Sequence, residues 1–180
     1  FATSGACLRL VCERMGLRLD ERAAERVERL RIEHTRRGLQ AGAEVIAALS
    51  ELRRRGLKLG LMSVCGPETP ALWPRTPLAP LFDAALFSSR VGLRKPDPRF
   101  YALACERLGV QARSCLYVGD GDGGELTGAS VLGMDALLIC LPGEESFVLA
   151  REEVREWSGP RVRSPAEVLS FVISRGDEGT

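Results

Sequence analysis

The sequence predicts an α/β fold built on a doubly wound parallel sheet, preceded by a small α-helical unit. From residue 41 onward, short apolar runs of strand length alternate with segments of helical periodicity. This alternation is typical of a parallel sheet with helices on both faces. The first forty residues show helical periodicity only. With 180 residues, 45% of them hydrophobic, the chain is long enough to bury one core.

The N-terminal unit is predicted to be a pair of helices. The first helix ends at Gly16, and the second begins after Asp20, whose carboxylate suits an N-cap. We expect three divisions of the chain: a partial helical unit at 1–40, an α/β core at 41–175 and a tail at 176–180. The apolar faces of the two helices contain Leu8, Val11, Cys12 and Met15, and then Ala23, Val27 and Leu30.

The predicted core begins with a helix through Val45 and Leu52 that Gly56 ends. Further helices are expected at 97–108 and 125–132, and Pro165 opens the last one. A Pro-rich loop at 67–80 separates the first two strands. Four strands are expected, at 57–62, 84–87, 115–118 and 136–140.

Composition and charge exclude several classes of protein. The 25 Lys and Arg residues against 24 Asp and Glu leave a net charge of +1 spread along the chain, so nucleic acid is not an expected partner. Charged residues interrupt every apolar run, so no membrane span is expected. The six cysteines form no C-x-x-C pair and only one histidine is present, which argues against a zinc site. We therefore expect reduced, buried thiols in a cytoplasmic protein that acts on a small molecule.

Hydroxyl, ammonium and carboxylate groups follow the predicted strands, where ligands bind in α/β folds. Ser63 follows the first strand, Lys95 lies in the loop after the second, and Asp120 and Glu125 follow the third. A hydroxyl can hold phosphoryl oxygens, a lysine offsets their charge, and carboxylates are the hard ligands that Mg²⁺ prefers. The pattern therefore indicates a phosphate site with a divalent metal ion.

Three segments around these residues resemble, in their order and spacing, the motifs of the haloacid dehalogenase-like (HAD) superfamily. The likeness covers about residues 41–142, and residues 1–40 resemble the helical cap that many members carry. The segments similar to the second, third and fourth motifs are Leu59 to Ser63, Gly92 to Pro98, and Tyr117 to Glu125 continuing to Ala129.

The resemblance implies an activity and a role for each of the four residues. It implies a magnesium-dependent phosphatase that hydrolyses a small phosphorylated metabolite through an aspartyl-phosphate. Ser63 would hold a phosphoryl oxygen, and Lys95 would stabilise the charge of nucleophile and phosphate. Asp120 would be a ligand of Mg²⁺ and Glu125 would support the metal shell. Asp122 is an additional acid for which no role is implied.

The sequence departs from the superfamily at the first motif. The pattern D-x-D-x-T or D-x-D-x-V, which carries the nucleophilic aspartate, is absent from the 180 residues. The resemblance implies that this motif precedes the cap, so we expect the natural protein to extend upstream of Phe1 and residues 1–180 alone to be nearly inactive. We also expect the core to lack its first strand, which in the superfamily lies between the strands that end at Ser63 and Asp120.

Other functions stay open. A dehalogenase or phosphonatase of the same fold is one alternative, although halide displacement needs no metal and the acids around Asp120 argue against it. A non-catalytic binding or sensor protein is another. An EF-hand starting at Asp120 is excluded, because its sixth and twelfth positions require Gly and Glu, and here they are Glu125 and Val131.

Three further residues are expected to be structural. Trp73, in the Pro-rich loop, is expected to pack over the core, although a place at the substrate entrance is the alternative. His34 is expected to be solvated or partly packed, since nothing in the sequence offers it a catalytic partner. Cys65 lacks a neighbouring His or Lys that would lower its pKa, so we expect no catalytic role.

Overall fold

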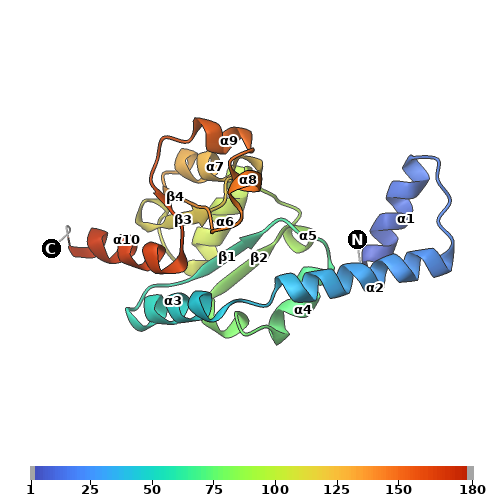
Figure 1. Ribbon diagram of the computed structural model, residues 1–180, viewed down its shortest axis with the longest axis horizontal. Coiled ribbons are helices and arrows are strands. Elements are labelled where there is room, and N and C mark those ends of the chain that lie inside the picture. Colours follow the sequence, from blue (N-terminus) through green and yellow to red (C-terminus); the bar gives the residue numbers. More distant parts are fainter. Residues whose placement is uncertain (1–2, 178–180) are drawn as a thin grey trace.

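The structure, a computed structural model, describes residues 3–177 and consists of parallel β-strands covered by α-helices (Figure 1). The predicted α/β class is therefore confirmed. The α-helices are α1 (Ser4–Arg14), α2 (Glu21–Gly38), α3 (Ala43–Arg54), α4 (Glu68–Leu72), α5 (Ser88–Val91), α6 (Pro98–Leu108), α7 (Glu125–Val131), α8 (Glu145–Val148), α9 (Glu152–Glu156) and α10 (Pro165–Asp177). Short 3₁₀ helices are η1 (Trp73–Arg75), η2 (Ala79–Leu81), η3 (Ala112–Ser114) and η4 (Asp122–Gly124).

The strands are parallel, as predicted, but they form two sheets in the described part of the chain. In the first sheet β1 pairs with β2, and Ser63 lies opposite Phe87. The second sheet has the order β3-β4-β5. Within residues 3–177 no backbone ladder joins β1 to β3. The strands are β1 (Gly60–Ser63), β2 (Ala84–Phe87), β3 (Leu116–Gly119), β4 (Asp135–Ile139) and β5 (Arg161–Val162).

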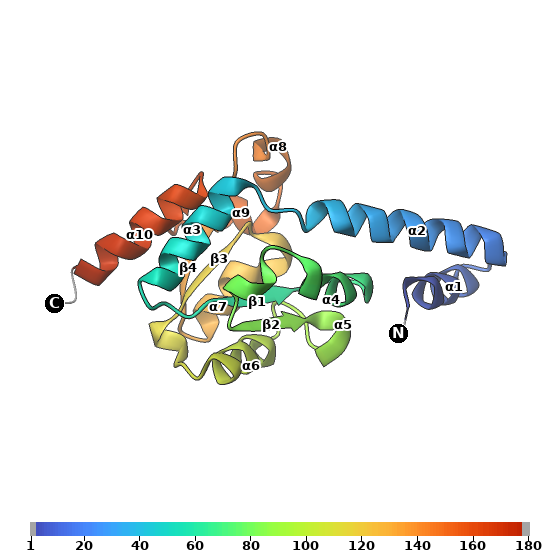
Figure 2. The same ribbon diagram turned by 90° about the horizontal axis from the view of Figure 1, so that it is seen from below.

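Helices cover both faces of the strands. Helix α6 packs against β1 and β2, and α7 packs against β3 and β4. Helices α3 and α10 pack against each other. Figure 2 shows α3 and α10 on one side of the strands and α6 and α7 on the other. Because helices cover the faces of the strands, a ligand can bind at the carboxyl ends of the strands, where the loops meet.

The apolar core has two parts that correspond to the two sheets. The larger part surrounds Tyr101, Leu126 and Leu138, and the smaller one contains Leu86 and Phe100. Met62, on β1, packs against both parts. Side-chain packing, rather than strand pairing, therefore joins the two sheets in the described residues.

The two N-terminal helices form a hairpin that projects from the strands (Figures 1 and 2). The Asp20 carboxylate caps α2 as predicted, accepting a hydrogen bond from the backbone N–H of Ala23 at 2.8 Å. The chain turns before it at Gly16, whose φ of +71° suits glycine. Arg31 of α2 forms an ion pair with the buried carboxylate of Glu68 on α4 at 2.7 Å. This pair is one of the contacts by which α2 lies on α4.

Several boundaries differ from those expected. Strand β1 begins at Gly60 rather than at 57, because the backbone N–H of Leu59 is bonded to the Asp83 carboxylate at 2.8 Å instead of to a strand. The Pro-rich segment 67–80 contains α4 and η1 and begins η2, so it is more ordered than a loop. Helix α10 includes residues 176 and 177, which were expected in the tail, and residues 178–180 lie outside the described residues.

Trp73 packs in the core, as expected for a structural residue. It is 8% exposed and makes edge contacts with Phe82 and Phe87 at ring-centroid distances of 5.5 and 5.8 Å. The interpretation that places it at a substrate entrance is therefore not favoured. The six cysteines are free thiols, but only Cys105 is buried and the others are half-buried, which corrects the expectation that they are buried.

None of the helices in residues 3–177 has both the length and the apolar character that a membrane crossing requires.

Burial within α7 predicts unequal effects of two truncations on stability. Leu126 is 0% exposed and belongs to the larger part of the core, whereas Val131 on the same helix is 76% exposed. We expect Leu126→Ala to lower the free energy of unfolding by about 2 to 5 kcal/mol, because it leaves a cavity. Val131→Ala is the matched control and should stay within about 0.5 kcal/mol of the parent chain. Urea denaturation measures both, and equal effects would contradict the described packing.

Candidate active site

The buried carboxylate of Glu125 organises the candidate site. Glu125 is the first residue of α7 and is 2% exposed. Its Oε2 accepts a hydrogen bond from the Tyr117 hydroxyl at 2.7 Å and is ion-paired with the Lys95 ammonium. Its Oε1 accepts a hydrogen bond from the backbone N–H of Gly121 at 3.0 Å. A carboxylate in the core is stable only with such partners, so these donors define its position.

Glycine residues allow the Glu125 carboxylate to lie this close to the backbone that follows β3. A Cβ atom on Gly119 would lie 2.2 Å from Oε1 of Glu125, and one on Gly121 would lie 2.3 Å from Val154. Gly121 also has a φ of +77°, in the region that favours glycine. The glycines that flank Asp120 are therefore required by the packing around the carboxylate.

Lys95 reaches Glu125 from the loop that connects α5 to α6. Its side chain is 16% exposed, and that of Glu125 is 3% exposed. The following residue, Pro96, lies against the first turn of α7, where a Cβ atom on Gly128 would approach it to 3.0 Å. Burial raises the pKa of Tyr117 far above its usual value, and the Glu125 charge raises it further, so this phenol stays a hydrogen-bond donor.

Asp120, directly after β3, is paired with an arginine that sequence analysis did not identify. Arg151 Nη1 lies 2.6 Å from Oδ1 of Asp120 and also donates to its backbone oxygen at 2.6 Å. Burial would raise the pKa of Asp120, but the hydrogen bond and charge of Arg151 outweigh it and hold that pKa below its usual value. The Glu125 side chain adjoins Asp120 as well. Arg151 carries no motif signal, since arginine is abundant in this sequence.

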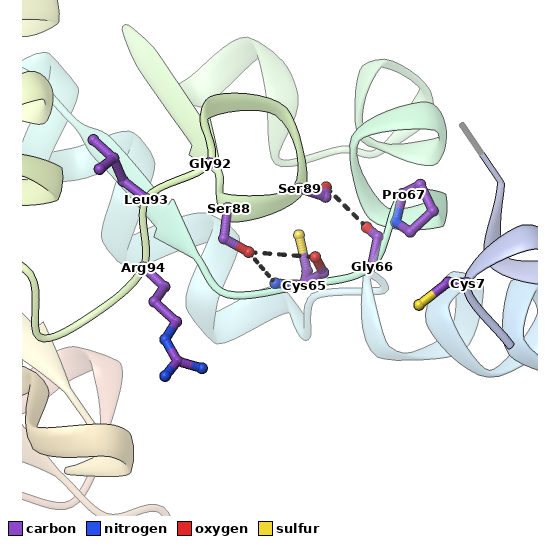
Figure 3. Close-up of a pocket in the computed structure, with 9 residues that line it drawn as sticks. All are labelled: Cys7, Cys65, Gly66, Pro67, Ser88, Ser89, Gly92, Leu93 and Arg94. Carbon is purple, nitrogen blue, oxygen red and sulfur yellow. Dashed lines mark hydrogen bonds between the residues drawn. The ribbon is translucent and has the colours of Figure 1, made fainter. Parts of the chain in front are cut away.

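Ser63 ends β1 and is half-buried. Among residues 3–177, no side-chain hydrogen bond joins it to Lys95, Asp120 or Glu125, so its hydroxyl is available to a ligand. The loop after it is held by Ser88, whose hydroxyl accepts from the backbone N–H of Cys65 at 3.0 Å and lies 3.3 Å from its carbonyl oxygen (Figure 3). The structure thus brings Lys95, Asp120 and Glu125 together, and it leaves Ser63 as a separate prediction.

Two open cavities lie beside this loop. One, of about 350 Å³, includes Cys65, Gly66, Ser88 and Ser89, with Cys7 of α1 on its far side (Figure 3). The other, of about 550 Å³, lies between the same loop and the α2 face that carries His34. Both therefore lie between the N-terminal hairpin and the residues that follow Ser63. Asp122, by contrast, is exposed on the turn before α7.

The arrangement of the acids does not match a divalent-cation site. Within the described residues, no group of three or more Asp, Glu, His or Cys side chains is placed to hold a metal ion. Both oxygens of Glu125 accept hydrogen bonds, and Oδ1 of Asp120 is bound to Arg151. The chemistry of the donors suits Mg²⁺, but two side-chain cations occupy the places next to them. No step below is therefore derived through the ion.

Parallel strands with an acidic, lysine-paired site after their carboxyl ends are typical of α/β enzymes. The chain matches the haloacid dehalogenase-like hydrolase family over residues 6–133, and it belongs to that family. Relatives include a phosphatase of Mycobacterium tuberculosis, 37% identical over 58% of this chain and 49% of that protein. An (S)-2-haloacid dehalogenase of Pseudomonas sp. (strain YL) is 29% identical over 96% of this chain and 71% of that protein.

The fold comparison agrees with this family. The crystal structure of a HAD phosphatase from Thermococcus onnurineus superposes with a TM-score of 0.67 at 23% identity, over 91% of this chain and 69% of that one. The chain spans about half the length of the M. tuberculosis phosphatase that it matches.

The Lys95–Glu125 pair predicts that removing Lys95 lowers the stability strongly, and that a second substitution at Glu125 restores it. We expect Lys95→Met to lower the free energy of unfolding by about 3 to 5 kcal/mol, because it leaves a buried carboxylate without its cation. The double variant Lys95→Met/Glu125→Gln, which removes both charges, should recover most of the loss. Lys58→Met is the matched control, since Lys58 is the other lysine of the chain and is exposed. Urea denaturation at pH 7 measures all three; a Lys95→Met variant as stable as Lys58→Met would show that the pair contributes little.

Proposed function

We propose that this chain is part of a hydrolase that cleaves a phosphate ester of a small phosphorylated metabolite. The observation that carries the proposal is the fixed position of Lys95. Glu125, whose side chain adjoins Asp120, pairs with the Lys95 ammonium in a partly buried place where a positive charge acts strongly on a bound anion. The phosphatase among the relatives supports the same reaction.

Each side chain then has a specific task. Ser63 is half-buried, and its hydroxyl, which has no hydrogen-bond partner among the described residues, would donate to a phosphoryl oxygen. Lys95 would stabilise the negative charge that accumulates on phosphate and nucleophile during displacement. Glu125 would position Lys95, and it does not itself touch the substrate. The cavities beside Cys65 would admit the rest of the metabolite.

The nucleophile would be an aspartate supplied from outside residues 1–180. No D-x-D-x-T or D-x-D-x-V segment occurs in the chain. The separation of β1 from β3 supports the proposal, because a strand between them would complete one parallel sheet. Such a strand would end between Ser63 and Asp120 and would present its aspartate there. The carboxylate would attack phosphorus, and water would then hydrolyse the aspartyl-phosphate.

A second reaction, hydrolytic dehalogenation of a 2-haloacid, is favoured by a different observation. Lys95 and Arg151 already pair with the carboxylates of Glu125 and Asp120, so the site is charge-compensated by its own side chains. Halide displacement requires no metal ion, which fits that arrangement better than magnesium-dependent chemistry does. The dehalogenase relative also covers nearly the whole chain.

The two reactions are separated by assays on the natural protein, whose intact mass and N-terminal sequence are determined first. Phosphate release from p-nitrophenyl phosphate and from phosphorylated metabolites is measured with Mg²⁺ and with EDTA, and chloride release from (S)-2-chloropropionate in parallel. We expect phosphate release, and residues 1–180 alone should be slower by on the order of 10⁴ to 10⁶. Chloride release alone would favour the second reaction, and ligand binding without turnover would identify a sensor.

A substitution at Ser63 tests its predicted role. Ser63→Ala should lower kcat/KM for the phosphate ester by about 10² to 10³, because one donor to the phosphoryl group is lost. Ser114→Ala is the matched control, since Ser114 is exposed and lies before the amino end of β3, whereas the site follows the carboxyl ends of the strands. Equal activity of the two variants would remove Ser63 from the proposed site.

A further inference from the structure

Arg151 is the charged residue near the acids that neither the motifs nor the proposed reaction uses. It precedes α9, far along the chain from the motif residues, and its side chain is 14% exposed. One guanidinium nitrogen, Nη1, binds both the carboxylate and the backbone oxygen of Asp120, each at 2.6 Å. The guanidinium therefore fixes the conformation of Asp120 and also compensates its negative charge.

A second contact also holds the Arg151 side chain. Its guanidinium carbon lies 4.4 Å from the centre of the Phe147 ring, in the geometry of a cation–π contact. Phe147 is 65% exposed, so this aromatic ring covers the arginine and not the core. An arginine side chain that stacks on an aromatic ring is pre-organised, so it loses little conformational freedom when it forms the ion pair with Asp120.

The local charge balance shows what Arg151 does for the acids. Asp120, Asp122 and Glu125 lie in its electrostatic environment and raise its pKa, although burial acts in the opposite direction. Lys95 neutralises Glu125, so Arg151 is the cation in direct contact with Asp120. Without Arg151, the three carboxylates would face Lys95 alone, and the excess negative charge would attract a cation from solution.

We propose that Arg151 is the resident cation of this site: it occupies Asp120 in place of a metal ion and sets the affinity for a divalent cation. A cation binds Asp120 only after the guanidinium has left Oδ1. The free energy needed to break the Arg151–Asp120 pair therefore reduces the free energy of cation binding. By the same linkage, a bound cation weakens the hold on Arg151 and loosens the 147–151 segment next to the site. The proposal rests on the proposed function only in placing Asp120 in the active site.

Cation binding itself tests the proposal, independently of turnover. The natural protein is titrated with Mn²⁺, and the free ion is followed by electron paramagnetic resonance; Mg²⁺ is titrated by calorimetry. We expect Arg151→Gln to bind Mn²⁺ tenfold or more tightly than the parent protein. The double variant Arg151→Gln/Asp120→Asn should lose that gain. Arg155→Gln, an equal charge change at an exposed residue of α9, the helix that Arg151 precedes, should leave the affinity unchanged.

Two outcomes would overturn the proposal. Arg151→Gln could bind Mn²⁺ no better than Arg155→Gln, or its gain could persist in the double variant and so belong to another site.

If Arg151→Gln does not fold, Arg151→Lys is the second variant. It keeps the charge and most of the stem but cannot stack or reach both oxygens in the same way, and it should bind Mn²⁺ more tightly than the parent. The Nε–H resonance of Arg151, identified by its loss in Arg151→Lys, should shift when the parent protein is saturated with Mg²⁺; an unmoved resonance at saturation contradicts the proposal. Failure of these tests leaves phosphate hydrolysis unaffected, and absence of hydrolysis leaves the binding result valid.

Discussion

The buried Glu125 carboxylate is the group on which the rest of the site depends. An unpaired charge at 2% exposure would cost more than a small domain can sustain, so its partners are obligatory. Those partners come from three separate parts of the chain: Tyr117 on β3, the backbone of Gly121 in the following turn, and Lys95 in the loop before α6. All three partners therefore meet at one carboxylate, which explains how a loop lysine acquires a fixed place against the first residue of α7.

What the sequence predicts well is local in origin. The strand at 84–87 agrees with β2, and Asp20 caps α2, because apolar periodicity and capping depend on neighbouring residues. Lys95 and Glu125 were predicted in one site from motif order, but their direct contact required the fold. Arg151 could not be predicted, since it precedes a short helix without periodicity and its role comes from a residue 31 positions away. Strand β5 was missed because its two residues give no pattern.

The two cations give the site a character that the acids alone would not suggest. Read from the sequence, the run from Asp120 to Glu125 indicates a place for a metal ion. In the folded chain, Lys95 and Arg151 form ion pairs that neutralise much of that negative charge. Phosphate ester hydrolysis displaces an alkoxide from phosphorus and dehalogenation displaces a halide from carbon, so the two proposed reactions differ in the atom attacked and also in their need for a metal ion. Because Arg151 is the cation that contacts Asp120 in the folded chain, the need for a metal ion is the point on which the two proposed reactions make different demands on this site.

The division of the strands into two sheets has a consequence for motion. The β1–β2 pair and the β3-β4-β5 sheet are joined, in the described residues, by packing at Met62 and through α6 and not by a backbone ladder. Apolar contacts tolerate small sliding displacements that hydrogen-bonded strands resist. Where no strand bridges them, we expect the two halves to open as separate cooperative units, whereas the strand proposed between β1 and β3 would join them through a backbone ladder. Ser63 belongs to one half and Asp120 to the other, so the proposed bridging strand would also fix the distance across the site.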